Sequence, residues 1–409
     1  MNTDATQAVV IVGASHAATE AIASLRKFGW QGGITLIGDE TELPYQRPPL
    51  SKSYYKGEVE AERLLIRPAS FYEKNDVHLM LGRRVESINR DINTLSLDDG
   101  EQVSYQHLIL ATGTRARELP ISGADLPSIN YLRTKQDVDG IKSQLKAGSK
   151  LVIVGAGYIG LEVAASAVKQ GVDVIVFEAM DRVLARVTSP QVSEFYQRLH
   201  QEEGVEIRLN AALQKFEEAD QGFKAITADG EAISFDAAIV GIGVIPNSEL
   251  ADEAGLACDN GVLVDGYTQT NDPAIFAIGD CSNHHNILYN RRIRLESVPN
   301  ALEQAKVAAA KICGNGSVYD QLPWFWSDQY DVKLQTAGLL QGYDQIVTRG
   351  DATSRKFAVF YLQQGVLIAV DALNSPAEFI SSKKLIQHKF SPDVAQLADP
   401  DMPLKAFMT

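Results

Sequence analysis

Residues 155–160 are the first candidates for chemistry, because they read Gly-Ala-Gly-Tyr-Ile-Gly and keep the complete GxGxxG spacing. The apolar run before them predicts a strand and the periodic run after them predicts a helix, which is the context this motif requires. Gly155 permits a tight turn, Gly157 lets the backbone approach a pyrophosphate, and Gly160 allows close helix packing. The helix start adds N–H donors and a partial positive charge. We therefore expect a dinucleotide here; a turn used only for packing is the alternative.

An acidic residue follows the next predicted strand, where dinucleotide sites recognise a ribose. Glu178 comes directly after the strand expected at residues 172–177, about 20 residues beyond the glycine-rich turn. A carboxylate at this position accepts hydrogen bonds from both ribose hydroxyls and repels a 2′-phosphate. The sequence therefore favours NADH over NADPH.

A second, imperfect unit of the same kind lies at the start of the chain. Residues 13–18 read Gly-Ala-Ser-His-Ala-Ala and keep only the first glycine, Gly13, between a predicted strand and a predicted helix. Ser15 places a side chain where the backbone would meet a phosphate, so an unliganded turn is an equally good interpretation. Asp39 and Glu40 follow the next predicted strand and offer an acid to an adenosine ribose.

Two more short segments suit close contact with a second dinucleotide. Ala111, Thr112 and Gly113 follow one predicted strand, and Gly279 and Asp280 follow another. They supply small residues and a carboxylate for the polyol chain of such a ligand.

The elements needed to position these residues predict an α/β fold with two Rossmann-like dinucleotide-binding domains and a C-terminal α+β domain. In the last domain we expect strands at 343–349, 357–362 and 366–370 and a helix at 377–387. We place an FAD-type domain at 1–118 and 241–322, an NAD-type domain at 119–240, and the C-terminal domain at 323–409.

Composition narrows the classes of function. The formal charge of −14 disfavours nucleic acid and anionic membranes as main partners. No apolar run reaches the roughly 18–20 residues that cross a bilayer, and residues 1–8 lack the basic start of an export signal. We expect a cytoplasmic location.

Cysteine and histidine usage argues against metal and disulfide chemistry. Cys258, Cys281 and Cys313 are far apart in sequence and have no paired ligand spacing, so structural roles are expected. His284 and His285 are adjacent and point in different directions, which favours a polar loop over a shared metal. No metal site is predicted.

Taken together, the ATG, GxGxxG…E and FAIGD segments, in this order, resemble the FAD-dependent pyridine nucleotide reductases of glutathione reductase fold across essentially the whole chain. The runs RPPLSK (47–52), LESVPNALEQA (295–305) and PWFWSDQY (323–330) more narrowly resemble the NADH-dependent ferredoxin reductases that serve haem-thiolate mono-oxygenases and aromatic-ring dioxygenases. The resemblance implies FAD and NADH as cofactors.

The motifs and this resemblance together give the expected cofactor-binding residues. Around FAD the expected residues are Gly13, Ser15, His16, Ala17, Asp39, Glu40, Arg47, Lys52, Val85, Ala111, Thr112, Gly113, Arg133, Gly279, Asp280, Glu296, Ser297, Val298 and Trp326. Around NADH they are Gly155, Gly157, Tyr158, Ile159, Gly160, Glu162, Glu178 and Gly243. Ser15 and Ala18 depart from the commoner glycines, which puts the local backbone path in doubt.

The resemblance also predicts the catalytic residues Lys52, Glu162 and Trp326. Lys52 and Glu162 would pair beside the flavin N5, the ammonium stabilising charge on the reduced ring and the carboxylate holding the nicotinamide amide. Trp326 would cover the ring, and the helix that begins near Pro299 would aim its positive end at N1. Without the resemblance, a solvated lysine, a glutamate interacting with the helix dipole and a packed aromatic cluster are the better interpretations of these residues.

The expected electron acceptor is an iron–sulfur ferredoxin. Residues 43–52 contain no cysteine, so electrons must leave the flavin without a thiol relay. Acidic ferredoxins need a locally positive docking face. Arg291, Arg292 and Arg294 supply one cluster and Lys383 and Lys384 add another, and we expect some of these residues to flank the exposed flavin edge; solvated charges are the alternative. An NADH oxidase and an NADH-sensing flavoprotein resembling apoptosis-inducing factor are the alternative functions, and we expect a monomer.

Overall fold

The structure is a computed structural model that describes residues 8–220 and 222–408. The prediction that the chain lacks an export signal concerns residues 1–8. Of these, only Ala8 is among the described residues. The chain forms two compact units. The first contains the chain up to Gln46 with residues 61–115 and 245–323, and the second contains residues 47–60, 116–244 and those from Trp324 onward.

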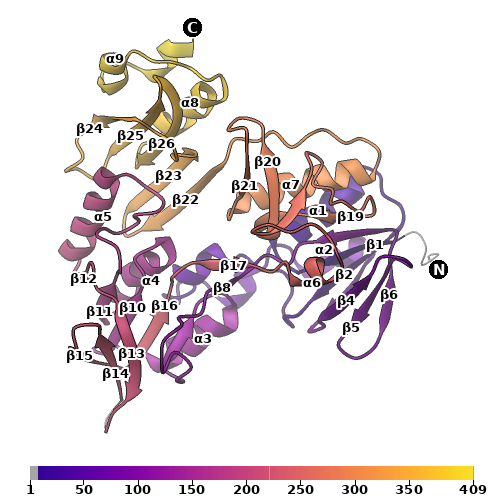
Figure 1. Ribbon diagram of the computed structural model, residues 1–409, viewed down its shortest axis with the longest axis horizontal. Helices are drawn as coiled ribbons and strands as arrows, with labels where there is room; N and C mark the ends of the chain where they lie inside the picture. Colours follow the sequence, from indigo (N-terminus) through magenta and orange to yellow (C-terminus); the bar gives the residue numbers. More distant parts are fainter. Residues whose placement is uncertain (1–7, 221, 409) are drawn as a thin grey trace. The chain divides into compact units, whose positions relative to one another are not determined.

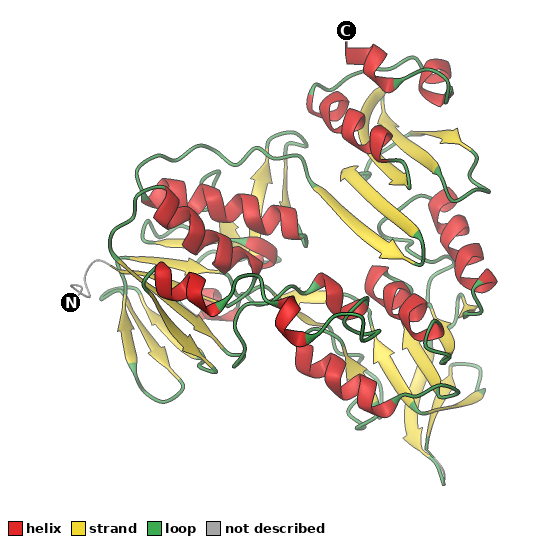
Figure 2. Cartoon of the chain, turned by 180° about the vertical axis from the view of Figure 1, so that it is seen from behind, coloured by secondary structure: helices red, strands yellow, loops and turns green. Residues whose placement is uncertain are grey.

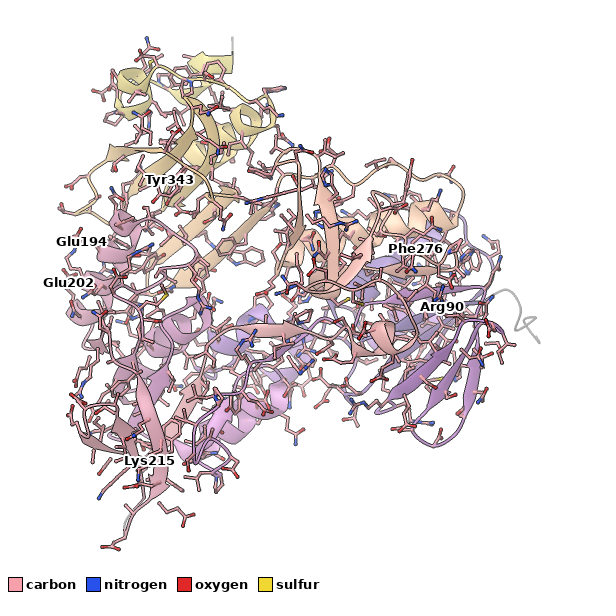
Figure 3. The ribbon with its side chains drawn as sticks, in the orientation of Figure 1. Arg90, Glu194, Glu202, Lys215, Phe276 and Tyr343 are labelled. Carbon is pink, nitrogen blue, oxygen red and sulfur yellow. The ribbon has the colours of Figure 1, made fainter. Side chains whose placement is uncertain are left out.

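The first unit is built on a five-stranded parallel sheet with the strand order β19-β7-β1-β2-β3 (Figure 1). These strands are β1 (Ala8–Val12), β2 (Gly33–Gly38), β3 (Val77–Leu81), β7 (His107–Leu110) and β19 (Ile275–Ala277). The central strands are nearly continuous apolar runs because both faces of a parallel sheet are covered. Phe276 of β19, for example, is 1% exposed inside this unit (Figure 3).

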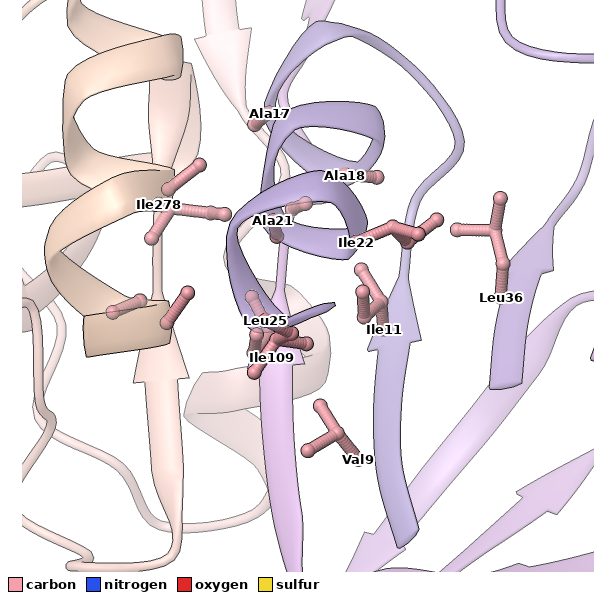
Figure 4. Packing of buried hydrophobic residues seen from close by; sticks show 14 of the residues in the cluster. Val9, Ile11, Ala17, Ala18, Ala21, Ile22, Leu25, Leu36, Ile109 and Ile278 are labelled. Carbon is pink, nitrogen blue, oxygen red and sulfur yellow. The ribbon is translucent and has the colours of Figure 1, made fainter. Parts of the chain in front are cut away.

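Helices α1 (His16–Lys27) and α7 (Val298–Ile312) lie side by side in this unit (Figures 1 and 2). Figure 4 shows the reason: Ala21, Ile22 and Leu25 of α1 point into a cluster with Ile11 and Ile109 of the sheet. Small alanines on both helices allow their backbones to approach closely. The βαβ unit predicted at the start of the chain is therefore confirmed.

Smaller elements complete the first unit. Two three-stranded sheets have the orders β4-β5-β6 and β18-β20-β21. The elements are η3 (Ala61–Leu64), α2 (Ala69–Lys74), β4 (Val85–Asn89), β5 (Thr94–Leu97), β6 (Gln102–Ser104), α6 (Glu249–Glu253), β18 (Val262–Val264), η4 (Gly279–Cys281), β20 (Ser282–Asn286) and β21 (Arg291–Arg294). Arg90 fixes the end of β4 to the chain before β19 through a 2.8 Å ion pair with Asp272 (Figure 3).

The second unit contains another five-stranded parallel sheet, in the order β12-β11-β10-β16-β9. Its elements are η2 (Pro48–Ser51), β9 (Ile129–Tyr131), α3 (Lys135–Gln144), β10 (Lys150–Val154), α4 (Tyr158–Val168), β11 (Asp173–Phe177), α5 (Pro190–Glu202), β12 (Glu206–Arg208), β13 (Leu213–Glu218), β14 (Phe223–Thr227), β15 (Ala232–Phe235) and β16 (Ala237–Val240). β13, β14 and β15 form an antiparallel sheet. The second predicted βαβ unit is confirmed as β10, α4 and β11.

The end of the chain adds an antiparallel sheet with the order β22-β23-β26-β25-β24. Its elements are β22 (Trp324–Gln329), β23 (Val332–Gly338), β24 (Gln345–Gly350), β25 (Phe357–Gln363), β26 (Val366–Leu373), α8 (Pro376–Gln387), α9 (Val394–Ala398) and η5 (Leu404–Met408). The predicted fold class is confirmed: two parallel sheets of the dinucleotide-binding type precede an α+β region.

Two of the points at which the chain passes from one unit to the other lie in β8 (Thr114–Ala116) and β17 (Val244–Pro246), which pair with each other. The predicted domain boundaries near residues 118 and 240 lie within a few residues of these strands. The three-domain division stays a prediction, because residues 324–409 belong here to the same unit as residues 116–244.

Across residues 8–220 and 222–408, no helix is long and apolar enough to span a bilayer.

The buried face of α1 makes a stability prediction. Ile22 is fully buried and Ile92 is 65% exposed in the same unit, so the same substitution tests burial at both positions. We expect Ile22→Ala to lower the free energy of unfolding by about 2–5 kcal/mol, and Ile92→Ala to leave it within about 0.5 kcal/mol. Urea unfolding followed by far-ultraviolet circular dichroism measures both; equal losses would contradict the assigned packing.

Candidate functional site

Two glycines of the glycine-rich turn in the second unit are required by contacts within the protein, whether or not a ligand binds. Gly155 follows β10 with a φ of +101°, and a Cβ added to it would lie 2.5 Å from the Gly241 carbonyl oxygen. A Cβ on Gly160 would lie 2.2 Å from the Gly155 carbonyl oxygen. Packing alone therefore requires these two glycines, as the motif predicts.

Neither backbone conformation nor packing requires glycine at position 157. It caps the start of α4 with an ordinary φ of −77°, and an added Cβ would meet only the Gly241 carbonyl oxygen, at 3.9 Å. The space over this residue is left open beside the free N–H groups of the first helical turn. Such a cradle fits a dinucleotide pyrophosphate, and a methyl group there would obstruct it.

Glu178 is fixed beside this turn. Its Oε2 accepts a 2.7 Å hydrogen bond from the Ala156 N–H, and its Oε1 accepts one of 2.9 Å from the Met180 N–H. Each carboxylate oxygen keeps a lone pair for a further donor. The structure thus brings Glu178 together with the glycine-rich turn, as a ribose-binding acid requires. Ile159 and Met180 are 45% and 43% exposed, so each presents an apolar surface.

In the first unit, Gly13 and Ala111 are in direct contact. Gly13 has a φ of +104°, and an added Cβ would lie 2.2 Å from the Ala111 carbonyl oxygen. Ser15 caps α1 in an extended conformation without a side-chain capping bond, and its Oγ lies 3.4 Å from His16 Nδ1. Ala17 is buried and its Cβ lies 3.4 Å from the position of a Cβ on Gly279. Three predicted segments, at residues 13–18, 111–113 and 279–280, therefore meet around this turn.

Gln304 locks the turn at Gly279 to helix α7. Its Oε1 accepts hydrogen bonds from the Gly279 N–H at 2.7 Å and from Ser282 Oγ at 2.8 Å. Ser297 caps α7, its Oγ accepting from the Asn300 N–H at 3.3 Å, with proline in the first turn. The predicted helix start is confirmed. Gln304 was not singled out from the sequence, although it lies in the 295–305 run.

The remaining predicted residues of the first unit occupy separate positions. Thr112 Oγ1 donates to the Asn247 carbonyl at 2.6 Å, and the Asn247 N–H donates to the Gly113 carbonyl at 3.0 Å. Asp39 is exposed after β2, and Glu40 accepts a hydrogen bond from the Tyr45 hydroxyl. Further members of this set are Val85, buried at the start of β4; Asp280, half-buried after Gly279; Glu296, paired with Arg294 at 2.7 Å; and Val298, the first residue of α7.

In the second unit, Lys52 and Glu162 form the predicted ion pair. Lys52 Nζ lies 2.5 Å from Glu162 Oε2, and the Glu162 residue is 3% exposed. Glu162 Oε2 also accepts from Ser51 Oγ at 2.6 Å, and Oε1 accepts from Ser327 Oγ at 2.6 Å. The buried carboxylate is therefore compensated by one cation and two hydroxyls.

The two serines were missed by the sequence reasoning. Ser51 lies in the 47–52 run and Ser327 in the 323–330 run, so the motifs contain them. Ser51 is held in turn, because its carbonyl accepts a 2.8 Å hydrogen bond from Ser166 Oγ of α4. Both hydroxyls are almost completely buried.

Other predicted residues of the second unit lie on the same segments. Arg47 Nη1 donates to the Arg133 carbonyl at 2.8 Å, which joins two predicted positions. Trp326 is half-buried on β22 and packs against Trp324 at a ring-centroid distance of 5.9 Å. Tyr158 packs edge-on against Phe325 at 4.8 Å. Gly243 has a φ of +107° and no atom within 4 Å of an added Cβ.

The loop expected at His284 and His285 is wrong. Both residues lie in strand β20, so their side chains leave opposite faces, and His284 is 1% exposed while His285 is exposed. Burial lowers the pKa of His284 to about 4, with Arg292 acting in the same direction. The imidazole is thus a neutral core group, packed edge-on against Tyr319 at 4.9 Å.

The three cysteines carry the features of structural thiols. All are free, and Cys281 is buried. Burial raises the pKa of each thiol, to about 11 for Cys258. A redox-active cysteine needs the opposite shift, because the thiolate is the reactive form.

Two arginines of the predicted docking cluster, Arg292 and Arg294, make hydrogen bonds to the backbone within the first unit. Arg292 Nη1 donates to the carbonyls of Asn283 and Val264, at 3.1 and 3.3 Å. Arg294 has a side chain only 10% exposed and donates to the Asp280 carbonyl at 3.2 Å. Charge reversal at these two positions would therefore disturb folding together with any docking role, which stays a prediction.

Comparison with known proteins identifies two family regions. Residues 7–305 match the pyridine nucleotide-disulphide oxidoreductase family, and residues 324–408 match the reductase C-terminal family. The chain is 45% identical over 403 residues to putidaredoxin reductase of Pseudomonas putida, covering 97% of this chain and 96% of that protein. It is 44% identical over 398 residues to rhodocoxin reductase of Rhodococcus erythropolis, covering 97% and 93%. A crystal structure of the covalent putidaredoxin reductase–putidaredoxin complex superposes with a TM-score of 0.95, at 44% identity over 98% of each chain.

The two glycines of the turn give a matched test. Gly160→Ala places a methyl group against the Gly155 carbonyl, and we expect it to cost about 1–3 kcal/mol of stability. Gly157→Ala meets no such atom, so its thermal midpoint stays at the wild-type value while dinucleotide binding weakens by about tenfold. Differential scanning fluorimetry and calorimetric titration with NADH separate the effects. Unchanged NADH affinity in the Gly157 variant would show that no pyrophosphate lies over this turn.

Proposed function

Because the chain belongs to the pyridine nucleotide-disulphide oxidoreductase family, we propose that it is an FAD-dependent NADH:ferredoxin reductase. Bound FAD would accept hydride from NADH and release the electrons singly to a two-iron ferredoxin, which feeds a haem-thiolate mono-oxygenase or an aromatic-ring dioxygenase. Support comes from the full-length similarity to reductases that are named for their iron–sulfur partners, one of them solved in complex with that partner. We further propose a monomer in the cytoplasm, where NADH is produced.

One observation carries this proposal: a largely buried ion pair includes a lysine from a segment that contains no cysteine. Lys52 pairs with Glu162 at 2.5 Å, and the segment around Lys52 contains no cysteine. Output without a thiol relay suits an acceptor that takes electrons directly from a flavin. An iron–sulfur protein is such an acceptor.

The pair assigns a role to each of its side chains. The ammonium of Lys52 is a fixed positive charge, suited to stabilising negative charge that develops during reduction. The Glu162 carboxylate holds this ammonium in place and keeps one lone pair, on Oε1, for the amide of a nicotinamide. Ser51 and Ser327 restrain the carboxylate from two directions, so the ammonium is oriented before any ligand arrives.

The remaining residues are proposed to hold the two dinucleotides. The open cradle over Gly157 and the carboxylate of Glu178 fit NADH. The contact between Gly13 and Ala111, the turn at Gly279 and the start of α7 fit FAD. The positive end of a 15-residue helix also favours negative charge nearby. Trp326 offers an aromatic surface for a planar ring.

A sequence of spectroscopic measurements tests the proposed function. We expect purified protein to be yellow with bound FAD, to bleach on anaerobic addition of NADH, and to reduce cytochrome c much faster when a two-iron ferredoxin is present. Colourless protein that retains no flavin would rule the function out. Oxygen consumption that is indifferent to ferredoxin would favour the oxidase alternative, and slow turnover with a change in oligomeric state would favour a sensor.

Glu178 gives a test of nucleotide preference. Glu178→Gln keeps an acceptor for the Ala156 N–H and gives up the bond from the Met180 N–H, and it removes the negative charge, so repulsion of a 2′-phosphate disappears. We expect kcat/KM for NADPH to rise by about tenfold, equivalent to about 1.4 kcal/mol, while that for NADH falls. Glu194→Gln, an exposed residue of α5 (Figure 3), is the matched control. Unchanged preference in Glu178→Gln would remove this residue from the ribose site.

A further inference from the structure

The buried carboxylate of Glu162 is the end of a longer hydrogen-bonded chain within the second unit. Ser327 Oγ contacts Glu162 Oε1 at 2.6 Å and Gln329 Nε2 at 3.2 Å. Gln329 Oε1 lies 2.8 Å from His200 Nε2, and His200 Nδ1 lies 3.0 Å from the Tyr330 hydroxyl. Ser327, Gln329 and His200 are at most 1% exposed. Four contacts therefore join the ion pair to helix α5 and to the turn after β22.

The ionised carboxylate sets the direction of every hydrogen bond in this chain. A carboxylate only accepts, so Ser327 must donate to Glu162 and accept from the Gln329 amide N–H. The Gln329 carbonyl then faces His200, which must donate from Nε2. A neutral imidazole with its proton on Nε2 accepts at Nδ1, so the Tyr330 hydroxyl donates. All four donors point toward Glu162.

The surroundings of His200 favour the neutral imidazole that this direction requires. Burial lowers the pKa of His200 to about 4, although the bond to Gln329 and the charge of Glu203 act in the opposite direction. The ring packs edge-on against Tyr330 at 5.0 Å. Tyr330 is itself restrained, since it occupies a turn with a φ of +56° and lies under the Lys169 ammonium at 5.5 Å.

We propose that His200 is a positioning residue which, through Gln329 and Ser327, holds the Glu162 carboxylate in a fixed orientation and so keeps Lys52 in place for hydride transfer. The catalytic consequence rests on the proposed function, whereas the direction of the hydrogen bonds rests on the contacts above and on the neutral imidazole of His200. Aligned donors polarise one another, so the last donor in the chain is strengthened by those behind it. Without His200, the Gln329 amide is free to turn and the Ser327 hydroxyl loses its fixed orientation.

The first test reads the direction of the chain without any activity. Protein labelled with ¹⁵N-histidine is examined by long-range ¹H–¹⁵N correlation at pH 7, with His200→Gln identifying the signal. We expect a neutral His200 with the proton on Nε2 and Nδ1 bare. A proton on Nδ1, or an imidazolium, would overturn the proposal. This experiment stands even if the chain retains no flavin.

The second test compares two substitutions of His200 by amide side chains that differ in length. The side-chain nitrogen of His200→Gln reaches the position of Nε2, whereas that of His200→Asn reaches only the position of Nδ1. We expect His200→Asn to slow anaerobic flavin reduction by NADH about tenfold with little change in KM, and His200→Gln to restore most of that rate. Photochemical reduction of the flavin and the thermal midpoint serve as controls for folding.

Equal rates in the two His200 variants and the wild type would contradict the proposal, as would equal losses in both variants. If His200→Asn does not fold, Gln329→Leu is measured instead, because it removes the same amide link, and a wild-type rate in that variant overturns the proposal. A wild-type protein that takes hydride from NADH but reduces no ferredoxin would refute the proposed partner and leave these comparisons valid.

Discussion

A carboxylate that is removed from water needs nearby hydrogen-bond donors or cations to offset the lost hydration. In the second unit, this constraint brings several elements together around Glu162. Its two oxygens take one ammonium and two hydroxyls, and each of those donors is itself held by another contact. Removing one donor would leave a buried charge partly unpaired, which is far more costly than losing an exposed ion pair. The contacts around Glu162 are therefore those that compensate its buried negative charge.

This compensation draws on three distant stretches of sequence. Helix α4 supplies the acid, η2 and its end supply Ser51 and Lys52, and β22 supplies Ser327. The pairings span 110, 111 and 165 residues. A tightly coordinated charge therefore also ties separate elements together, and the hydrogen-bonded chain through Gln329 and His200 extends this restraint to α5.

The features of the fold and site that could be predicted from sequence are those that depend on residues close together in the chain. The glycine-rich turns, Glu178 and the start of α7 at Ser297 depend on residues within about 20 positions of one another, and the printed pattern contains them. The Lys52–Glu162 pair was reached only through resemblance, because no local rule links a lysine after two prolines to a glutamate in a distant helix. Ser51, Ser327 and Gln304 were missed because their importance comes from long-range contacts. The expected loop at His284 failed because a polar strand with one buried face looks like a loop in sequence.

The strand order of the first sheet has a consequence for the growing chain on the ribosome. β1, β2, β3 and β7 emerge early, but β19, their neighbour at the edge, is made only after the entire second parallel sheet, from β9 to β16. Translation at about 5–20 residues per second therefore leaves the earlier sheet incomplete for many seconds while the later one closes first. Until residue 277 appears, the edge of β7 is an open template for pairing, and nascent-chain chaperones have a defined interval in which to protect it.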